Sequence, residues 1–226
     1  MCGRYVLDDP ALAGEEYRIE TDEVPWRPSY NIAPTQKVMV VRERPDGVRE
    51  AVPMQWWLIP SWSKTDQRKY PTFNARCESL SLKPTWSKPF RQTRCIIPSS
   101  AFIEWKKLDS KTKQPYLIYI KDKPIQSFAG VWDSWTNRET GEVLESCSII
   151  TTEANDLVAE IHDKKRMPVF LHPEEYDEWL DPENHDTDQL ERLFKPYPSE
   201  AMAAHKIGSK IGSPKHNSPE LIEPIE

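Results

Sequence analysis

The sequence predicts an α+β fold that is mainly β, with a curved sheet or open barrel flanked by short helices. Twenty-one prolines stand against seven glycines, and proline interrupts helices while favouring turns and sheet edges. Seven short runs are rich in β-branched and aromatic residues, as strands are. Helical spacing is clearest after Thr152, where three short helices are expected. Few gaps between elements are long, so we expect one domain spanning residues 1–226.

The seven expected strands are bounded by Pro, Asp or Gly, the residues that commonly end strands. Seven strands of this length favour a sheet that curves on itself over a flat one. They are 37–42, 51–57, 94–98, 101–105, 116–120, 127–132 and 143–151.

The expected helices are short. Leu157 and Ile161 stand four residues apart, which predicts a helix that Thr152 caps and that ends near His162. Pro173 suits the first turn of a second helix, and a third is expected over 186–194. The stretch 181–198 is polar and contains prolines, so it resembles a linker.

Charge is unevenly distributed along the chain. The formal net charge is −6, which argues against a nucleic-acid partner. However, residues 64–94 hold eight basic and two acidic residues, whereas residues 171–200 hold ten acidic and two basic ones. The basic stretch predicts a face that attracts phosphate, although a solvated charged surface would have the same composition.

Composition also indicates a cellular compartment. The chain has no apolar window of about 18 residues and does not open with a charged, apolar leader, so we expect an intracellular, cytoplasmic protein without a membrane partner. Its four cysteines, at positions 2, 77, 95 and 147, lack metal-ligand spacing. We therefore expect no metal and no cofactor, and a reducing environment.

Cys2 becomes the amino terminus if Met1 is removed. It would then carry an α-amine and a thiol on one residue, a 1,2-aminothiol that condenses with an aldehyde and closes to a thiazolidine. The α-amine has a pKa near ~7.8 against ~10.4 for lysine, so far more of it is neutral at physiological pH. Cys2 is thus a candidate nucleophile, with a small buried hydrophobe in a first strand as the alternative.

Two further stretches carry groups suited to substrate binding. Asn74 can orient a carbonyl or a sugar hydroxyl through its donor and its acceptor. The planar guanidinium groups of Arg4 and Arg76 can each donate paired hydrogen bonds to a phosphate. A capped strand end with a surface arginine is the alternative around residue 74.

Two titratable side chains are candidates for proton transfer. Alternation along 101–105 places Glu104 on the same face as Phe102, where partial burial would raise its pKa toward neutrality. An exposed ion pair with Lys106 or Lys107 is the alternative. His162 titrates near neutral pH and suits acid-base work, although a histidine at a helix end can be purely structural.

Six ordered stretches span nearly the whole chain and together resemble one family. They are MCGRY at 1–5, YNIAPTQ at 30–36, FNARCES at 73–79, PSSAFIEW at 98–105, IHDKKRMP at 161–168 and IGSPKHNSPELI at 211–222. These motifs are similar to those of the SOS-response-associated peptidase (SRAP) family, whose members crosslink themselves to abasic sites in single-stranded DNA. Any one stretch alone would be inconclusive.

The resemblance implies a compact, mainly β fold and a function in DNA damage repair during the SOS response. It implies a covalent thiazolidine linkage between Cys2 and the abasic sugar, with Asn74, Glu104 and His162 in the active site. A β-lyase activity and peptidase removal of Met1 by the protein itself are also implied. A monomer would suffice, because each protein molecule is consumed when it forms its own adduct. The expected location is the cytoplasm, in association with the nucleoid.

The resemblance also implies a DNA-binding groove. Arg4 and Arg76 match phosphate-binding positions, and Asn31 lies in a motif lining the same pocket. Trp62 is a candidate platform for base stacking. The chain reads Trp56-Trp57 where related chains usually read Trp-Gly, so the aromatic wall of the groove is expected to differ.

Two functions from other classes remain as alternatives. N-terminal-cysteine glutamine amidotransferases also open with Met-Cys-Gly, but they typically continue with small apolar residues, whereas here Arg4 and Tyr5 follow. A noncovalent single-stranded-DNA-binding module would make Cys2 incidental. Crosslinking to an abasic oligonucleotide separates all three.

Overall fold

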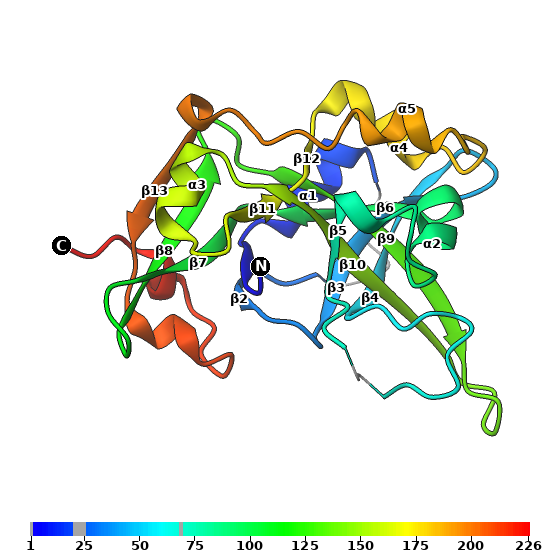
Figure 1. Cartoon of the computed structure of the whole chain (residues 1–226), viewed down its shortest axis with the longest axis horizontal. Helices are drawn as coiled ribbons and strands as arrows, with labels where there is room; N and C mark the ends of the chain where they lie inside the picture. Colours follow the sequence, from blue (N-terminus) through cyan, green and yellow to red (C-terminus); the bar gives the residue numbers. More distant parts are fainter. Residues whose placement is uncertain (1, 20–25, 68–69) are drawn as a thin grey trace.

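The computed structural model describes residues 2–19, 26–67 and 70–226. Within these ranges the strands fall into two sheets, one of five and one of eight strands (Figure 1). The strands are β1 (Tyr5–Leu7), β2 (Ser29–Ile32), β3 (Lys37–Glu43), β4 (Arg49–Trp56), β5 (Asn74–Arg76), β6 (Arg94–Ser99), β7 (Ala101–Lys107), β8 (Lys113–Ile120), β9 (Gln126–Thr136), β10 (Val143–Glu153), β11 (Arg166–Pro168), β12 (Phe170–Leu171) and β13 (Met202–Lys206).

The larger sheet closes on itself. The order β10, β4, β3, β6, β9 returns to β10, because β9 and β10 also pair as a long antiparallel hairpin. The result is a five-stranded barrel, to which β5 and β11 attach along β10 and β12 along β9. Its interior is tight: a Cβ added to Gly130 of β9 would lie 2.9 Å from Ile97 Cδ1. Any larger residue at this position would require the Ile97 side chain to shift, and glycine avoids that.

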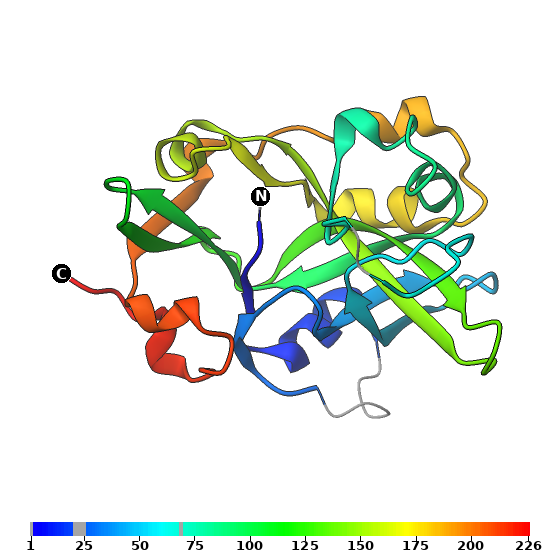
Figure 2. The same cartoon turned by 60° about the horizontal axis from the view of Figure 1, so that its bottom comes forward.

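The smaller sheet has the order β13, β8, β7, β1, β2 and packs beside the barrel. Its strands alternate between two apolar clusters, as a pleated strand requires. Tyr5 and Phe102 belong to the main core that the sheet shares with the barrel. Val6 and Ile103 point to the other face, which is covered by side chains of the C-terminal segment such as Ile211. The N-terminal strand therefore lies in the middle of the molecule (Figure 2).

The helices are short and lie outside the sheets. Asp9 caps the first of them by accepting a hydrogen bond from Leu12 N–H at 2.9 Å, and a proline occupies its first turn. A 3₁₀ turn at Pro173–Glu175 leads into the fourth. The helices are α1 (Pro10–Tyr17), α2 (Ser87–Gln92), α3 (Asp156–Ile161), α4 (Tyr176–Leu180) and α5 (Thr187–Glu191).

The predicted mainly β fold with short flanking helices is confirmed. All seven expected runs are strands, namely β3, β4, β6, β7, β8, β9 and β10. The helix expected after Pro173 forms as α4, and the helix expected over 186–194 forms as the shorter α5.

Two details of the prediction are wrong. Thr152 does not cap α3, because β10 runs on to Glu153 through its pairing with β11, and Asn155 caps the helix by accepting from Val158 N–H at 3.0 Å. The stretch 181–198 is not a linker, since Leu190 and Tyr197 are buried in the main core. Its polar residues face outward while regularly spaced apolar ones pack inward.

Candidate active site

Cys2 lies just before β1, and β1 is held between β2 and β7. The residue is fully buried, and its thiol donates to the carbonyl oxygen of Arg4 at 3.7 Å. Burial raises the pKa of the Cys2 thiol well above its ordinary value, and the negative charge of Glu104 raises it further. The thiol is therefore protonated at neutral pH, and the Glu104 carboxyl lies close enough to influence it.

Asn74 connects the barrel to the N-terminal segment. It begins β5, which runs parallel to β10 with Asn74 opposite Ile149. Its Nδ2 donates to the carbonyl oxygen of Cys2 at 2.6 Å. Its Oδ1 is buried and accepts no hydrogen bond from the described residues. A buried acceptor of this kind is suited to a hydroxyl or amine of a bound substrate.

Glu104 reaches the same place from β7. It is 4% exposed and shares the face of Phe102, as the alternation of the strand predicts, so the expected burial is confirmed and the alternative of an exposed side chain is wrong. Burial raises the pKa of Glu104 to about 7. A carboxyl with that pKa exchanges protons readily at neutral pH, which is the requirement for general acid-base catalysis.

His162 ends helix α3 and faces Glu104. Its Nε2 lies 3.6 Å from Glu104 Oε2, and its Nδ1 lies 3.0 Å from the carbonyl oxygen of Arg166. Because a carbonyl only accepts, Nδ1 carries the hydrogen and Nε2 is the basic nitrogen directed at the carboxyl. Burial lowers the pKa of His162, so the imidazole is mainly neutral and is able to receive a proton.

A cavity of about 400 Å³ opens at this carboxyl and imidazole. Its volume lies within the range of small-ligand sites. Burial raises the pKa of Glu104, and the Lys164 ammonium at the rim of the cavity offsets part of that rise. Burial lowers the pKa of His162, and the same ammonium lowers it further. The lining residues are Glu104, Trp105, Lys113, His162, Asp163, Lys164 and Gly212.

Arg4 and Asn31 contact each other and the C-terminal segment. Arg4 Nη1 donates to Asn31 Oδ1 at 2.6 Å and to the carbonyl oxygen of Ile211 at 3.0 Å. Its guanidinium also lies over the ring of Trp105, 5.9 Å from the centroid. Both residues are thus beside the cavity, with polar groups engaged by protein atoms.

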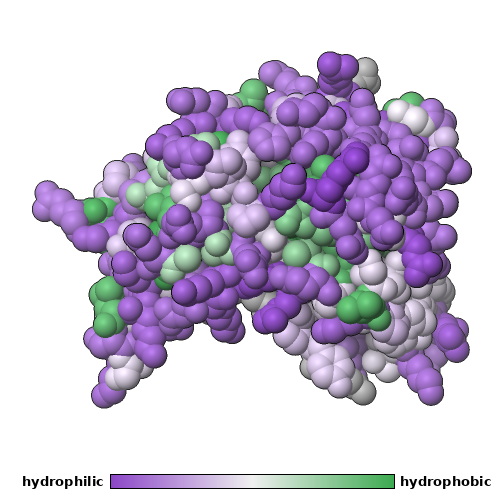
Figure 3. Space-filling view, turned by 45° about the horizontal axis from the view of Figure 1, so that its top comes forward, coloured by the Kyte–Doolittle hydropathy of each residue, from purple (hydrophilic) through white to green (hydrophobic). Residues whose placement is uncertain are grey.

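Arg76 and Trp62 lie on the surface. Arg76 is exposed at the end of β5, two residues beyond Asn74. Trp62 is 59% exposed, with its ring nitrogen donating to Pro84 O at 3.3 Å. The face in Figure 3 is mostly hydrophilic, with small apolar areas between charged and polar side chains. An exposed tryptophan of this kind is available for stacking.

The basic stretch 64–94 is only partly a surface feature. Lys64, Lys83 and Lys88 are exposed, whereas Arg94 is 3% exposed. The Arg94 guanidinium is held by backbone carbonyls, among them Trp179 O at 2.7 Å. Arg94 therefore does not belong to a phosphate-binding face. Positions 68 and 69 of the stretch lie outside the described residues.

Trp57, where related chains usually have glycine, and Arg166, in the IHDKKRMP stretch, both make contacts near β5. The ring of Trp57 packs against Phe73, next to Asn74, with centroids 5.1 Å apart. In the basic motif before Pro168, Arg166 forms an ion pair with Glu78, with Nη1 to Oε1 at 2.5 Å. The first residue adds aromatic surface near β5, and the second ties β11 to the turn after β5.

Sequence reasoning missed several residues of the cavity. Lys113 begins β8. Gly212 lies far along the chain from Glu104, in the 3₁₀ turn Ser209–Gly212. Of these two, Gly212 had a signal, because it lies in the C-terminal stretch IGSPKHNSPELI. Lys113 reaches the cavity through the β7–β8 hairpin, where it pairs with Lys107.

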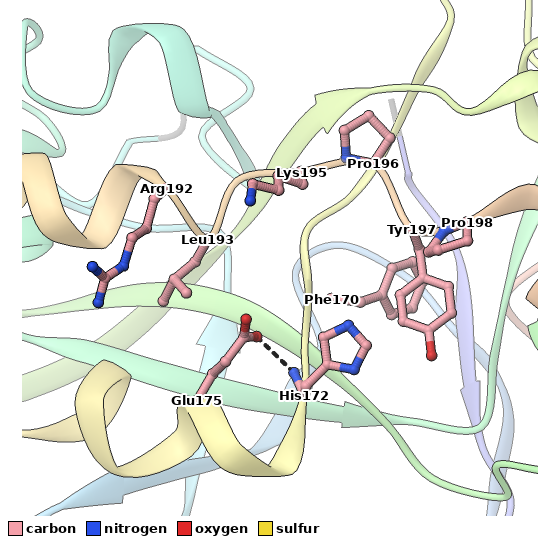
Figure 4. Close-up of a pocket in the computed structure, with 9 residues that line it drawn as sticks. All are labelled: Phe170, His172, Glu175, Arg192, Leu193, Lys195, Pro196, Tyr197 and Pro198. Atoms are coloured by element: carbon pink, nitrogen blue, oxygen red, sulfur yellow. Dashed lines mark hydrogen bonds between the residues drawn. The ribbon is translucent and has the colours of Figure 1, made fainter.

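A second cavity of about 230 Å³ contains none of the four predicted catalytic residues (Figure 4). His172 and Tyr197 stack there with centroids 5.3 Å apart, and Glu175 Oε2 accepts from the backbone N–H of His172. Arg192 at its edge pairs with Glu178 at 2.6 Å. These polar groups are engaged within the protein, so the cavity at Glu104 is the candidate active site.

Comparison with known proteins identifies the family. The family model described as SOS response associated peptidase (SRAP) matches residues 1–214. The chain belongs to the SRAP family. It is 44% identical over 230 residues to the abasic site processing protein YoqW of Bacillus subtilis (strain 168), covering 99% of both chains. It is 30% identical to the abasic site processing protein HMCES of Gallus gallus, covering 89% of this chain and 67% of that one.

The fold is shared with a solved structure. The crystal structure of a protein from Bacteroides thetaiotaomicron matches with a TM-score of 0.89 at 30% identity, over 100% of both chains. In the described part of this SRAP family member, no group of three or more His, Cys, Asp or Glu side chains is arranged to hold a metal ion. None of its described helices combines the length and apolar character needed to cross a lipid bilayer.

Proposed function

We propose that the chain processes abasic sites by forming a covalent thiazolidine between Cys2, freed of Met1, and the ring-opened sugar of an abasic site in single-stranded DNA. The relatives YoqW and HMCES are named abasic site processing proteins, which supports the substrate class. The observation that carries the chemistry is the convergence on one residue: Asn74 donates to the Cys2 carbonyl, and Glu104, which faces His162, lies close enough for its charge to add to the burial that raises the pKa of the Cys2 thiol.

The first step is attack of the neutral α-amine on the sugar aldehyde, which gives a carbinolamine. Loss of water from the carbinolamine forms an imine, and the departing hydroxyl needs a proton. Glu104 can supply it, because its raised pKa keeps part of the carboxyl protonated at neutral pH. His162 Nε2, 3.6 Å away, exchanges protons with that carboxyl between steps.

The second step closes the ring. The Cys2 sulfur attacks the carbon of the protonated imine that remains once Glu104 has given its proton to the departing hydroxyl. The nitrogen keeps its hydrogen as it becomes the ring amine, and one water has been released overall. Because the thiol is protonated at neutral pH, it needs a base at the moment of attack. The Glu104 carboxylate left by the first step is that base. Asn74 would hold the Cys2 backbone in place and accept a hydrogen bond from the opened sugar through Oδ1.

Two further activities belong to the proposal. Removal of a C2′ proton from the imine, before the sulfur attacks, would expel the 3′ phosphate and nick the strand as a β-lyase. The peptidase activity in the family description would be removal of Met1 by the chain itself. Both activities depend on the α-amino nitrogen of Cys2. The β-lyase reaction needs this nitrogen as an imine, and removal of Met1 exposes it as a free amine.

The DNA strand would be held outside the cavity by general contacts. Arg76 is an exposed phosphate fork next to Asn74, and Trp62 offers a ring for stacking. An abasic site has no base to extract, so little flipping energy is required. We expect binding with little sequence preference, by a monomer acting inside the cell.

A denaturing gel tests the proposal. The protein is mixed with an oligonucleotide carrying one abasic site, and a slow band that survives denaturation is expected for the unaltered chain and for Cys77→Ala. The band should be absent for Cys2→Ala. Glutamine hydrolysis without the band would support an amidotransferase, and a shift seen only on a native gel would support noncovalent binding. A band that persists in Cys2→Ala would exclude the proposed nucleophile.

A further inference from the structure

The C-terminal strap, residues 209–217, forms one wall of the candidate active site. It contains the 3₁₀ turn Ser209–Gly212, and Gly212 lines the cavity together with Glu104 and His162. In Figure 2 this red-orange segment lies beside the N-terminal strands in blue. The strap contains no strand, so sheet pairing does not fix its position. The buried side chain of Ile211 anchors it.

Asn31 on β2 holds the strap through both hydrogens of its amide. Asn31 Nδ2 donates to Ser213 O and to His216 O, each at 2.9 Å. Its Oδ1 accepts from Arg4 Nη1 at 2.6 Å, and the residue is 2% exposed. All the polar atoms of the side chain are thus used within the protein. An asparagine at this depth has little capacity left for a DNA phosphate.

Arg4 completes the clamp from its position just before β1. Its Nη1 and Nη2 donate to the carbonyl oxygens of Ile211 and Gly212 at 3.0 and 3.3 Å. Arg4 is only two residues from Cys2, and the backbone that follows it is fixed by pairing of β1 with β7. The same arginine therefore connects the residue that carries the nucleophile to the strap that lines the cavity.

We propose that Asn31 and Arg4 are positioning residues, which hold the strap as a wall that confines the abasic sugar against Glu104 and His162. The proposal rests on the proposed function, because it assigns the wall a role in that reaction. Confinement of this kind keeps reacting atoms within bonding reach, and its loss lowers the maximal rate. A direct phosphate contact would instead lower the affinity for the strand.

Asn31→Asp tests the clamp with almost no change in volume. The new carboxylate can still accept from Arg4, but it cannot donate to Ser213 O or His216 O and would repel both. We expect the maximal single-turnover crosslinking rate at saturating abasic oligonucleotide to fall by about tenfold or more. Backbone amides of the strap should exchange hydrogen faster in the DNA-free protein. Capture of glycolaldehyde, which is too small to need the wall, should keep its rate.

Two other variants keep the test decisive. Asn137→Asp makes the same change on the β9–β10 hairpin, where Oδ1 accepts from Glu139 N–H at 2.9 Å as a carboxylate would, so the crosslinking rate should be unchanged. If Asn31→Asp does not fold, Asn217→Ala is used, because Asn217 Oδ1 anchors the strap by accepting from Tyr30 N–H at 2.7 Å. It should lower the maximal rate in the same direction.

Three outcomes would contradict a clamp or the reaction that it serves. Faster exchange in the strap with an unchanged maximal rate would overturn the proposal, since the wall would then be dispensable. Weaker binding of the oligonucleotide with unchanged exchange would overturn it too, in favour of a direct DNA contact. If the unaltered protein forms no crosslink, the proposed function fails by itself, and the hydrogen-exchange comparison still reports whether Asn31 holds the strap.

Discussion

His162 Nε2 lies 3.6 Å from Glu104 Oε2, and the two side chains come from different elements at the cavity, one from the end of α3 and the other from β7. Burial raises the pKa of Glu104 to about 7. Burial lowers the pKa of His162. Near neutral pH a proton on the pair is therefore held by Glu104, and the neutral imidazole faces it as an acceptor. Such a pair can serve a reaction that needs an acid in one step and a base in the next.

Replacement of Glu104 by Gln should slow crosslink formation by about 100-fold or more. The amide keeps the size of the side chain but cannot carry the proton that dehydration and ring closure require. The measurement is the single-turnover rate with an abasic oligonucleotide, for folded protein verified by circular dichroism. Equal rates for the variant and the unaltered chain would remove Glu104 from the mechanism.

The contribution of Glu104 to the stability of the fold should fall as pH rises from 5 to 8. The pKa of Glu104 is about 7 in the folded protein against 4.5 for the unperturbed group, so between these values the folded state holds a proton that the unfolded chain has released. Stability is then lost with rising pH, by up to about 3 kcal/mol for this group. The lowered pKa of His162 acts in the opposite direction, so the comparison must isolate Glu104.

Glu104→Gln provides that comparison, because it removes the carboxyl and keeps His162. Urea unfolding at pH 5 and pH 8 gives the free energy of unfolding for both proteins. We expect the unaltered chain to lose about 2.5 kcal/mol relative to the variant between the two pH values. A difference that does not change with pH would mean that the folded-state pKa of Glu104 is ordinary.

The strands that the sequence predicts well are the long ones. Runs such as those of β3 and β10 are rich in β-branched residues because much of each strand is buried in the barrel, and that composition is visible without a structure. β1, β2 and β5 were not predicted. They have three or four residues each, and in β2 and β5 the polar residues Asn31 and Asn74 interrupt the apolar pattern that marks a strand.

The candidate site followed from the sequence only in part. The burial of Glu104 could be expected from alternation along β7, and the place of His162 from the end of a helix. The contact between Asn74 and Cys2 spans 72 positions, so no spacing rule predicts it. Only the resemblance to a family brought these residues together. The role of Asn31 in holding the strap required the structure, because its partners there are backbone carbonyls.

Arg94→Ala should destabilise the fold by about 3 kcal/mol or more, because it leaves several buried carbonyl oxygens without a donor, each at a cost of about 1–3 kcal/mol. The guanidinium joins α2, the strand β6 and the end of α4, since Phe90 O accepts from Nη1 at 2.9 Å and Trp179 O from Nε at 2.7 Å. Burial lowers its pKa to about 10, so it is still charged at neutral pH. Urea unfolding measures the effect, with exposed Lys88→Ala as a control expected to change stability by less than about 0.5 kcal/mol.

Arg76→Ala should weaken binding to single-stranded DNA and reduce its salt dependence. One phosphate contact contributes about 0.7 to the slope of log K against log salt for a single strand, because binding releases condensed counterions. Arg76 is exposed at the end of β5, beside Asn74, so it can make such a contact without rearrangement. Titrations at several salt concentrations, with an intact oligonucleotide and the Cys2→Ala background, measure binding without crosslinking. An unchanged slope would place the phosphates elsewhere, whereas a fall of about 0.7 that is the same for different sequences would assign one phosphate to Arg76.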